Sequence, residues 1–248
     1  MQDFTHKDNI YKTRSTTIQE ELRSYFLTIY TLMSIALAIT AITAFATFSI
    51  PILTNLMFNL SPEGDLISIT AIGWLVTFAP LGISLYFAFE FNKINVQNAQ
   101  ILLWIYAILM GMSFASLGFV YTGLSIVKTF FICSGMFASM SFYGYVTKKD
   151  LTSLSSFLFM GLIGLIFALF TNLFLQSSGV DFALSCFTIL VFIGLITFDT
   201  QKLKELYYQG AYGSKKMSII AAFTLYLDFI NLFIYLLRFV GTRRRKND

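Results

Sequence analysis

The chain has 248 residues, of which 56% are hydrophobic and only 12% are charged. A soluble domain carries about 25% charged residues, so this composition indicates one integral membrane domain with no soluble partner domain. The net charge of +4 is not a nucleic-acid signal, because the basic residues cluster in short loops and at the C-terminal tail.

Histidine and cysteine usage excludes several kinds of site. His6 is the only histidine, and it lies in the polar N-terminus. Histidine-based metal sites and Ser–His or Cys–His catalysis are therefore excluded. Cys133 and Cys186 each lie inside an apolar run and are interpreted as small buried residues, not as a disulfide or metal pair.

The order of polar and apolar segments along the chain predicts an all-α membrane protein. Residues 1–24 are polar and are predicted to form a cytoplasmic extension, with a short interfacial helix beginning at 16–22. Apolar runs of about 20 residues follow, each long enough to cross a bilayer. They cover residues 25–49, 67–90, 98–121, 125–146, 152–175, 182–200 and 217–238. Residues 25–238 are therefore predicted to form a seven-transmembrane helix bundle, with 239–248 as a basic C-terminal tail.

Lysine and arginine predict the orientation. With the N-terminus in the cytoplasm, the basic residues on that side are Arg23, Lys93, Lys148, Lys149, Lys202, Lys204, Lys215 and Lys216. The opposite loops, near 50–66, 122–124 and 176–181, contain no Lys or Arg, as expected outside the cytoplasm. Seven full crossings place the basic run 243–246 outside. Either the last segment does not cross fully, or the tail is an exception.

Asp228 lies in the middle of the last apolar run. An aspartate at the centre of a membrane helix costs about 2.5–3.5 kcal/mol on insertion scales. Such residues usually face a protein interior or a wet cavity. Thr224, Asp228, Asn231 and Tyr235 fall on one helical stripe, which predicts that this helix lies inside the bundle.

Asp199 lies near the cytoplasmic end of the sixth span, which a short loop joins to the seventh. The two aspartates can meet only if the sixth span enters deeper than its polar flank suggests. Two carboxylates in a poorly solvated site cannot both ionise easily, so the pair would share a proton. Loss of that proton would drive the helices apart or create an oxygen-rich Ca²⁺ site on Asp199 and Asp228. Alternatively, Asp199 only caps a loop and Asp228 only bonds a neighbouring helix.

Glu90 closes the second span and is interpreted as an interfacial charge or as a third oxygen ligand near the pair. The chain has no phosphate-binding loop, nucleophile elbow or zinc-protease motif, so we expect neither an enzyme nor a resident cofactor. Intramembrane aspartyl proteases have a Gly-x-Gly-Asp pattern that Asp199 and Asp228 both lack.

Several stretches resemble the bacterial branch of the Bax-inhibitor-1 family over about residues 20–241. The specific ones are Phe198-Asp199-Thr200-Gln201 and Leu225-Tyr226-Leu227-Asp228-Phe229-Ile230-Asn231-Leu232-Phe233. Supporting ones are Ala99-Gln100 before Trp104-Ile105-Tyr106-Ala107, Val120-Tyr121-Thr122-Gly123, and Ser141-Phe142-Tyr143-Gly144-Tyr145 before Thr147-Lys148-Lys149-Asp150-Leu151.

The resemblance implies a seven-helix bundle with the last helix at its centre, in the bacterial inner membrane. It also implies a pH-sensitive Ca²⁺ leak whose sensor falls on Asp199 and Asp228. Some relatives carry a basic latch near the end of the second helix. Here Glu90 occupies that neighbourhood, with Lys93 one turn on, so Glu90, Lys93 and Asn231 are only accessory candidates.

The sequence therefore predicts a Ca²⁺ leak channel gated by protonation of Asp199 and Asp228, with the bilayer and Ca²⁺ as partners. An alternative is a regulator of a membrane-bound AAA protease without transport, acting through residues 1–24. A proton-coupled carrier is a third possibility.

Overall fold

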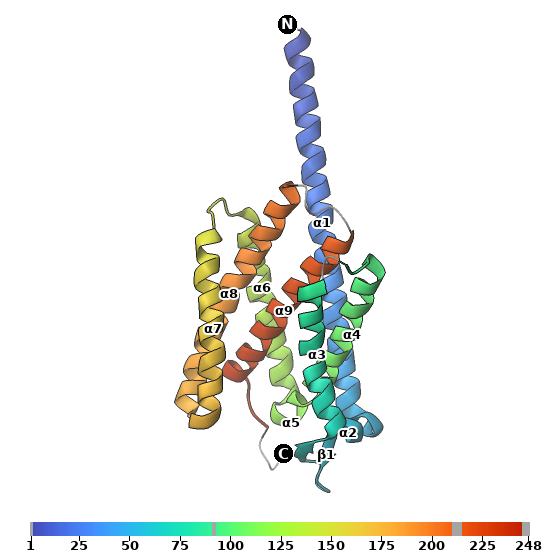
Figure 1. Cartoon of the computed structure of the whole chain (residues 1–248), viewed down its shortest axis with the longest axis vertical. Coiled ribbons are helices and arrows are strands. Elements are labelled where there is room, and N and C mark those ends of the chain that lie inside the picture. Colours follow the sequence, from blue (N-terminus) through green and yellow to red (C-terminus); the bar gives the residue numbers. More distant parts are fainter. Residues whose placement is uncertain (1, 91–92, 210–214, 245–248) are drawn as a thin grey trace.

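The computed structural model describes residues 2–90, 93–209 and 215–244, with the backbone alone for residues 2–17 (Figure 1). Its helices are α1 (Gln2–Ser49), α2 (Pro51–Met57), α3 (Ala71–Glu90), α4 (Val96–Phe114), α5 (Leu117–Val120), α6 (Gly123–Val146), α7 (Thr152–Leu175), α8 (Ser178–Tyr208) and α9 (Lys215–Val240). Two short strands, β1 (Phe58–Leu60) and β2 (Leu66–Ile69), pair in an antiparallel hairpin.

Seven helices in the described ranges are long and apolar enough to cross a membrane, as predicted. They contain residues 18–49 of α1, then α3, α4 with α5, α6, α7, α8 and α9. The second span begins later than predicted, because residues 66–69 form strand β2 and the helix starts at Ala71. Gly64, at φ 86°, occupies the turn of this hairpin, a conformation that glycine adopts without steric cost.

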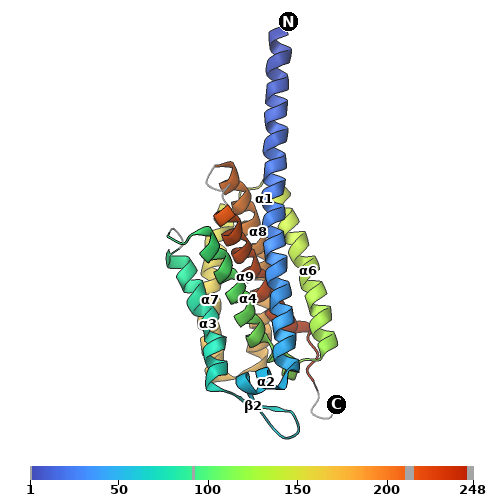
Figure 2. The same cartoon turned by 90° about the vertical axis from the view of Figure 1, so that its right-hand side faces the viewer.

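Helix α1 is continuous from Gln2 to Ser49, so no separate interfacial helix begins at 16–22. The sequence contains neither glycine nor proline before residue 50, and nothing in this stretch favours a helix break. The N-terminal part of α1 extends straight out of the bundle (Figures 1 and 2).

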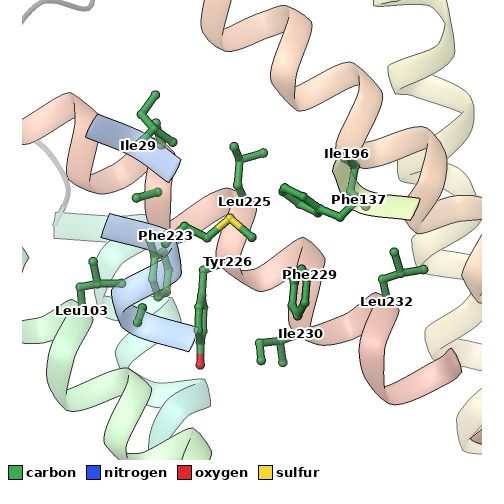
Figure 3. Packing of buried hydrophobic residues seen from close by; sticks show 14 of the residues in the cluster. Ile29, Leu103, Phe137, Ile196, Phe223, Leu225, Tyr226, Phe229, Ile230 and Leu232 are labelled. Carbon is green, nitrogen blue, oxygen red and sulfur yellow. The ribbon is translucent and has the colours of Figure 1, made fainter. Parts of the chain in front are cut away.

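Helix α9 lies at the centre of the bundle, as predicted. In its most apolar stretch 67% of the residues are buried, against 11–28% in the other spans. Helices α1, α4, α6 and α8 all pack against it (Figures 1 and 2). Its side chains form the middle of the core, where Leu225, Tyr226 and Leu232 are fully buried and Phe229 nearly so (Figure 3). Phe223 stacks on Phe87 of α3 with ring centroids 4.5 Å apart.

Helix α9 runs the length of the bundle, so residues 241–244, which follow it, lie at the end opposite the N-terminus (Figure 1). Beyond the helix, the Thr242 amide donates to Ser125 Oγ at 2.8 Å, and the Thr122 amide donates to the Thr242 carbonyl at 3.2 Å. The Arg244 amide donates to the Val120 carbonyl at 2.9 Å. The C-terminal segment is thus tied to the α5–α6 connection, at the end of the bundle opposite the N-terminus (Figure 1).

Candidate functional site

The two helices that carry the predicted aspartates pack directly against each other. Helix α8 continues to Tyr208, eight residues further than the predicted span, so Asp199 lies nine residues before its end. At 1.5 Å per residue this is a depth of about 14 Å, and Asp228 lies about 20 Å from the start of α9. Because α8 is longer than predicted, Asp199 lies deep enough in the bundle to meet Asp228.

The side chains of Asp199 and Asp228 lie within hydrogen-bonding reach of each other. Asp228 is only 6% exposed, and its Oδ2 atom has no hydrogen-bond partner among the described residues. A buried carboxylate with an unsatisfied oxygen is costly, whereas a proton between two carboxyl groups gives one oxygen a donor. The arrangement therefore favours a pair that holds one proton in common.

A chain of hydroxyl groups connects the residue after Asp199 to helix α1. Thr200 Oγ1 lies 2.9 Å from Ser141 Oγ of α6, and Ser141 Oγ lies 2.5 Å from the Tyr30 hydroxyl of α1. Thr200 also donates to the Ile196 carbonyl within its own helix at 2.7 Å. These contacts fix the rotation of α8 against α6 and α1, and hence the direction of the Asp199 side chain.

Gln201 and Lys204 explain why α8 stays helical beyond its apolar part. Gln201 Nε2 donates to the Lys149 carbonyl at 2.7 Å, and its Oε1 accepts from the Leu151 amide at 3.0 Å. Lys204 Nζ donates to the Tyr145 carbonyl at 2.6 Å, at the C-terminal end of α6 where a cation is favourable. The last two turns of α8 are thereby held by the α6–α7 connection.

A close backbone contact sets the height of α8 on α6. A Cβ atom built on Gly144 would clash with the Thr197 carbonyl oxygen, so only glycine allows this approach. Sequence reasoning identified neither Gly144 nor the roles of Ser141 and Gln201. All three lie in stretches that carried the resemblance, which was the available signal.

Tyr226 fixes the other side of α9. Its hydroxyl lies 2.8 Å from Thr40 Oγ1 of α1, and Thr40 also donates to the Ala107 carbonyl of α4 at 3.1 Å. Tyr226 is fully buried (Figure 3). This bond and the Asp199–Asp228 contact lie two residues apart on α9, so they join α9 to α1 and α8 at nearly the same depth.

The structure does not bring the accessory candidates to the pair. Glu90 Oε2 forms an ion pair with Lys93 Nζ at 3.0 Å, and both side chains are more than a third exposed. Glu90 thus has the position of an interfacial charge. Asn231 Nδ2 donates to the Leu227 carbonyl of its own helix at 2.9 Å, as Thr224 does to the Ile220 carbonyl at 3.2 Å. Thr224 and Asn231 therefore bond within α9, whereas Asp228 Oδ2 has no partner among the described residues.

Comparison with known proteins identifies the family. The model of the family described as inhibitor of apoptosis-promoting Bax1 matches residues 22–245. The chain belongs to the Bax inhibitor-1 family. An uncharacterized protein of Rickettsia prowazekii, RP147, is 51% identical over 234 residues, which cover 94% of this chain and 95% of the relative. The inner membrane protein YbhL of Escherichia coli K12 is 35% identical over 248 residues, covering 98% of this chain and 100% of the relative. A protein of Caulobacter vibrioides is 38% identical over 231 residues, 92% of either chain.

These matches cover the bundle and its tail together, and they agree with the seven spanning helices. This Bax inhibitor-1 family member is a multi-pass protein of the inner membrane, as predicted.

The carboxyl groups of Asp199 and Asp228 do not by themselves complete a Ca²⁺ site. Ca²⁺ takes six to eight oxygen ligands, and two carboxyl groups supply at most four. In the described part of the chain, His, Cys, Asp and Glu side chains form no group of three or more that could hold a metal. Glu90 does not complete such a set, because it is paired with Lys93.

Proposed function

We propose that this protein is a pH-sensitive Ca²⁺ leak channel, gated by protonation of Asp199 and Asp228. The observation that supports it is the contact between the two carboxyl groups, one of them buried on the central helix. Buried ionisable residues of membrane helices commonly lie on ion or proton pathways. The proposal assigns the pair to gating, not to catalysis.

In the closed state one proton lies between the two carboxyl groups and links α8 to α9. When the proton leaves, two negative charges face each other in a poorly solvated site and repel. Helices α8 and α9 then separate around Asp228, and the freed oxygens offer transient ligands to Ca²⁺. The leak should therefore increase as the pH rises.

The first test is Ca²⁺ flux into liposomes that contain the purified protein, between about pH 5 and about pH 8. The proposal expects passive flux that is larger at the higher pH. Flux that does not exceed that of protein-free liposomes at any pH would overturn it. Counter-flow exchange of Ca²⁺ against a proton gradient would instead favour the proton-coupled carrier, because a leak pore does not exchange.

A second candidate function is regulation of a membrane-bound AAA protease without transport. The observation in its favour is the N-terminal part of α1, which extends away from the bundle (Figure 2). Deletion of residues 2–20 separates the two functions. Protease modulation that is lost with residues 2–20, in a protein that shows no Ca²⁺ flux, supports the regulator. Ca²⁺ flux that persists without residues 2–20 supports the channel.

A further inference from the structure

A groove on the outer surface of the bundle lies between α1 and α6. It has a volume of about 340 Å³. Small side chains of α1 (Ser34, Ala38 and Ala41) form one wall, and α6 contributes Phe130 and Ser134 to the other. Phe229 of the central helix also lines it. The lining is apolar, as is typical of ligand sites in this size range.

The dimensions of the groove fit one hydrocarbon chain. Its wall on α1 runs from Tyr30 to Ala41, eleven residues or about 16 Å. The volume divided by this length gives a mean cross-section of about 20 Å². An extended hydrocarbon chain about 4–5 Å wide has a cross-section of about 13–20 Å², whereas an α-helix 10–12 Å wide needs about 80–110 Å². The groove is therefore too narrow to enclose a helix of another protein or of a second copy.

The groove lies at hydrocarbon depth on the N-terminal side of the bundle. Ala41 is about 12 Å and Tyr30 about 28 Å from the end of α1 at Ser49, in a bilayer core of about 30 Å. Arg23 lies seven residues before Tyr30 on the same face of α1 and is exposed. Its guanidinium is thus placed at the membrane surface above the groove, where it can pair with a phosphate.

We propose that this groove binds one acyl chain of a phospholipid from the leaflet on the N-terminal side, with the lipid phosphate beside Arg23. The bound chain would contact Phe229, which follows Asp228, and Tyr30, whose hydroxyl bonds Ser141. The proposed lipid site depends only on the groove and on the charge of Arg23, and it does not require the chain to conduct Ca²⁺.

Lipid exchange tests the site with two matched tryptophan reporters on α6. Trp74 and Trp104 are replaced by phenylalanine, and Phe130→Trp inside the groove is compared with Phe131→Trp, whose parent side chain is 69% exposed and does not line the groove. Vesicles with brominated acyl chains are then fused with proteoliposomes. We expect quenching at position 131 to follow lipid mixing at once and quenching at 130 to lag behind it. Equal rates at both positions mean ordinary surrounding lipid only and overturn the proposal.

Retained phospholipid gives a second measurement, by native mass spectrometry of protein in detergent. We expect Ala38→Phe, which fills the groove, to lower the retained lipid about tenfold, while Ala138→Phe on an exposed position of α6 leaves it unchanged. Arg23→Gln should lower it about two- to fivefold, as for a partly exposed charge contact. Equal retention in the parent and in Ala38→Phe would also overturn the proposal. Because neither measurement uses Ca²⁺, failure here leaves the proposed channel function to its own test.

Discussion

Replacement of Asp228 by asparagine removes one of the two charges that the gate requires. The side-chain amide introduced at this position can still donate to the Asp199 carboxylate, so α8 and α9 stay linked whatever the pH. In the parent protein the second deprotonation sets two unit charges against each other. At about 4 Å and an effective dielectric constant of about 20, their repulsion is about 4 kcal/mol. That energy changes an equilibrium constant about 10³-fold.

This magnitude sets the size of the expected effect. A channel that is open about 1% of the time with the shared proton would be open about 90% of the time without it. The flux ratio between about pH 8 and about pH 5 should thus be large in the parent and near one in Asp228→Asn. The assay is Ca²⁺ entry into proteoliposomes loaded with a fluorescent indicator. Both variants are checked for equal incorporation.

Asp181→Asn is the matched control. Asp181 is an aspartate of the same helix as Asp199, but it is half exposed and pairs with Arg238 at 3.9 Å at the other end of the bundle. This variant should keep the full pH dependence of the parent. If Asp228→Asn keeps it too, the pair does not set the pH response, and the gating argument fails.

Three further predictions concern the contacts that position the pair, each measured as a shift in thermal unfolding of the detergent-solubilised protein. Gly144→Ala should destabilise the folded protein by about 1–3 kcal/mol, because the new Cβ would clash with the α8 backbone. Gly135→Ala on the same helix has open space around its Cβ and should be nearly neutral. Equal effects of the two substitutions would contradict the close approach of α8 to α6. Gln201→Leu leaves two backbone groups of the α6–α7 connection without their partner and should cost about 1–3 kcal/mol, and an unchanged midpoint would show that α8 does not depend on this bridge. Tyr226→Phe should lower the free energy of unfolding by only about 1 kcal/mol, because Thr40 keeps its bond to the Ala107 carbonyl of α4. A loss above about 3 kcal/mol would contradict this reasoning.

The bundle could be predicted because its spans are long and uniformly apolar. The centre of the fold could also be predicted, since Asp228 on an apolar helix requires protein neighbours, and α9 is the most buried span. The hairpin was missed for the same physical reason. Residues 66–69 are apolar and directly precede a membrane helix, so composition alone does not separate strand from span.

The length of α8 and the supports of the pair could not be predicted from local sequence. Residues 201–208 have the polar composition that usually ends a membrane span, yet they remain helical. The contacts that keep them so, from Gln201 to the Lys149 carbonyl and from Lys204 to the Tyr145 carbonyl, join residues 52 and 59 positions apart. Such pairings depend on tertiary packing, which periodicity does not encode.

The central position of α9 has a consequence for how the protein is made. A ribosome delivers the chain from its N-terminus, so α1, α4, α6 and α8 reach the membrane before the helix against which all four pack. Until α9 emerges, Asp199 has no carboxyl partner, and α9 itself brings an aspartate that is expensive to insert alone. Assembly of the bundle must therefore wait until α9 has entered the membrane, and a nascent chain halted before residue 215 lacks the helix against which the other four pack.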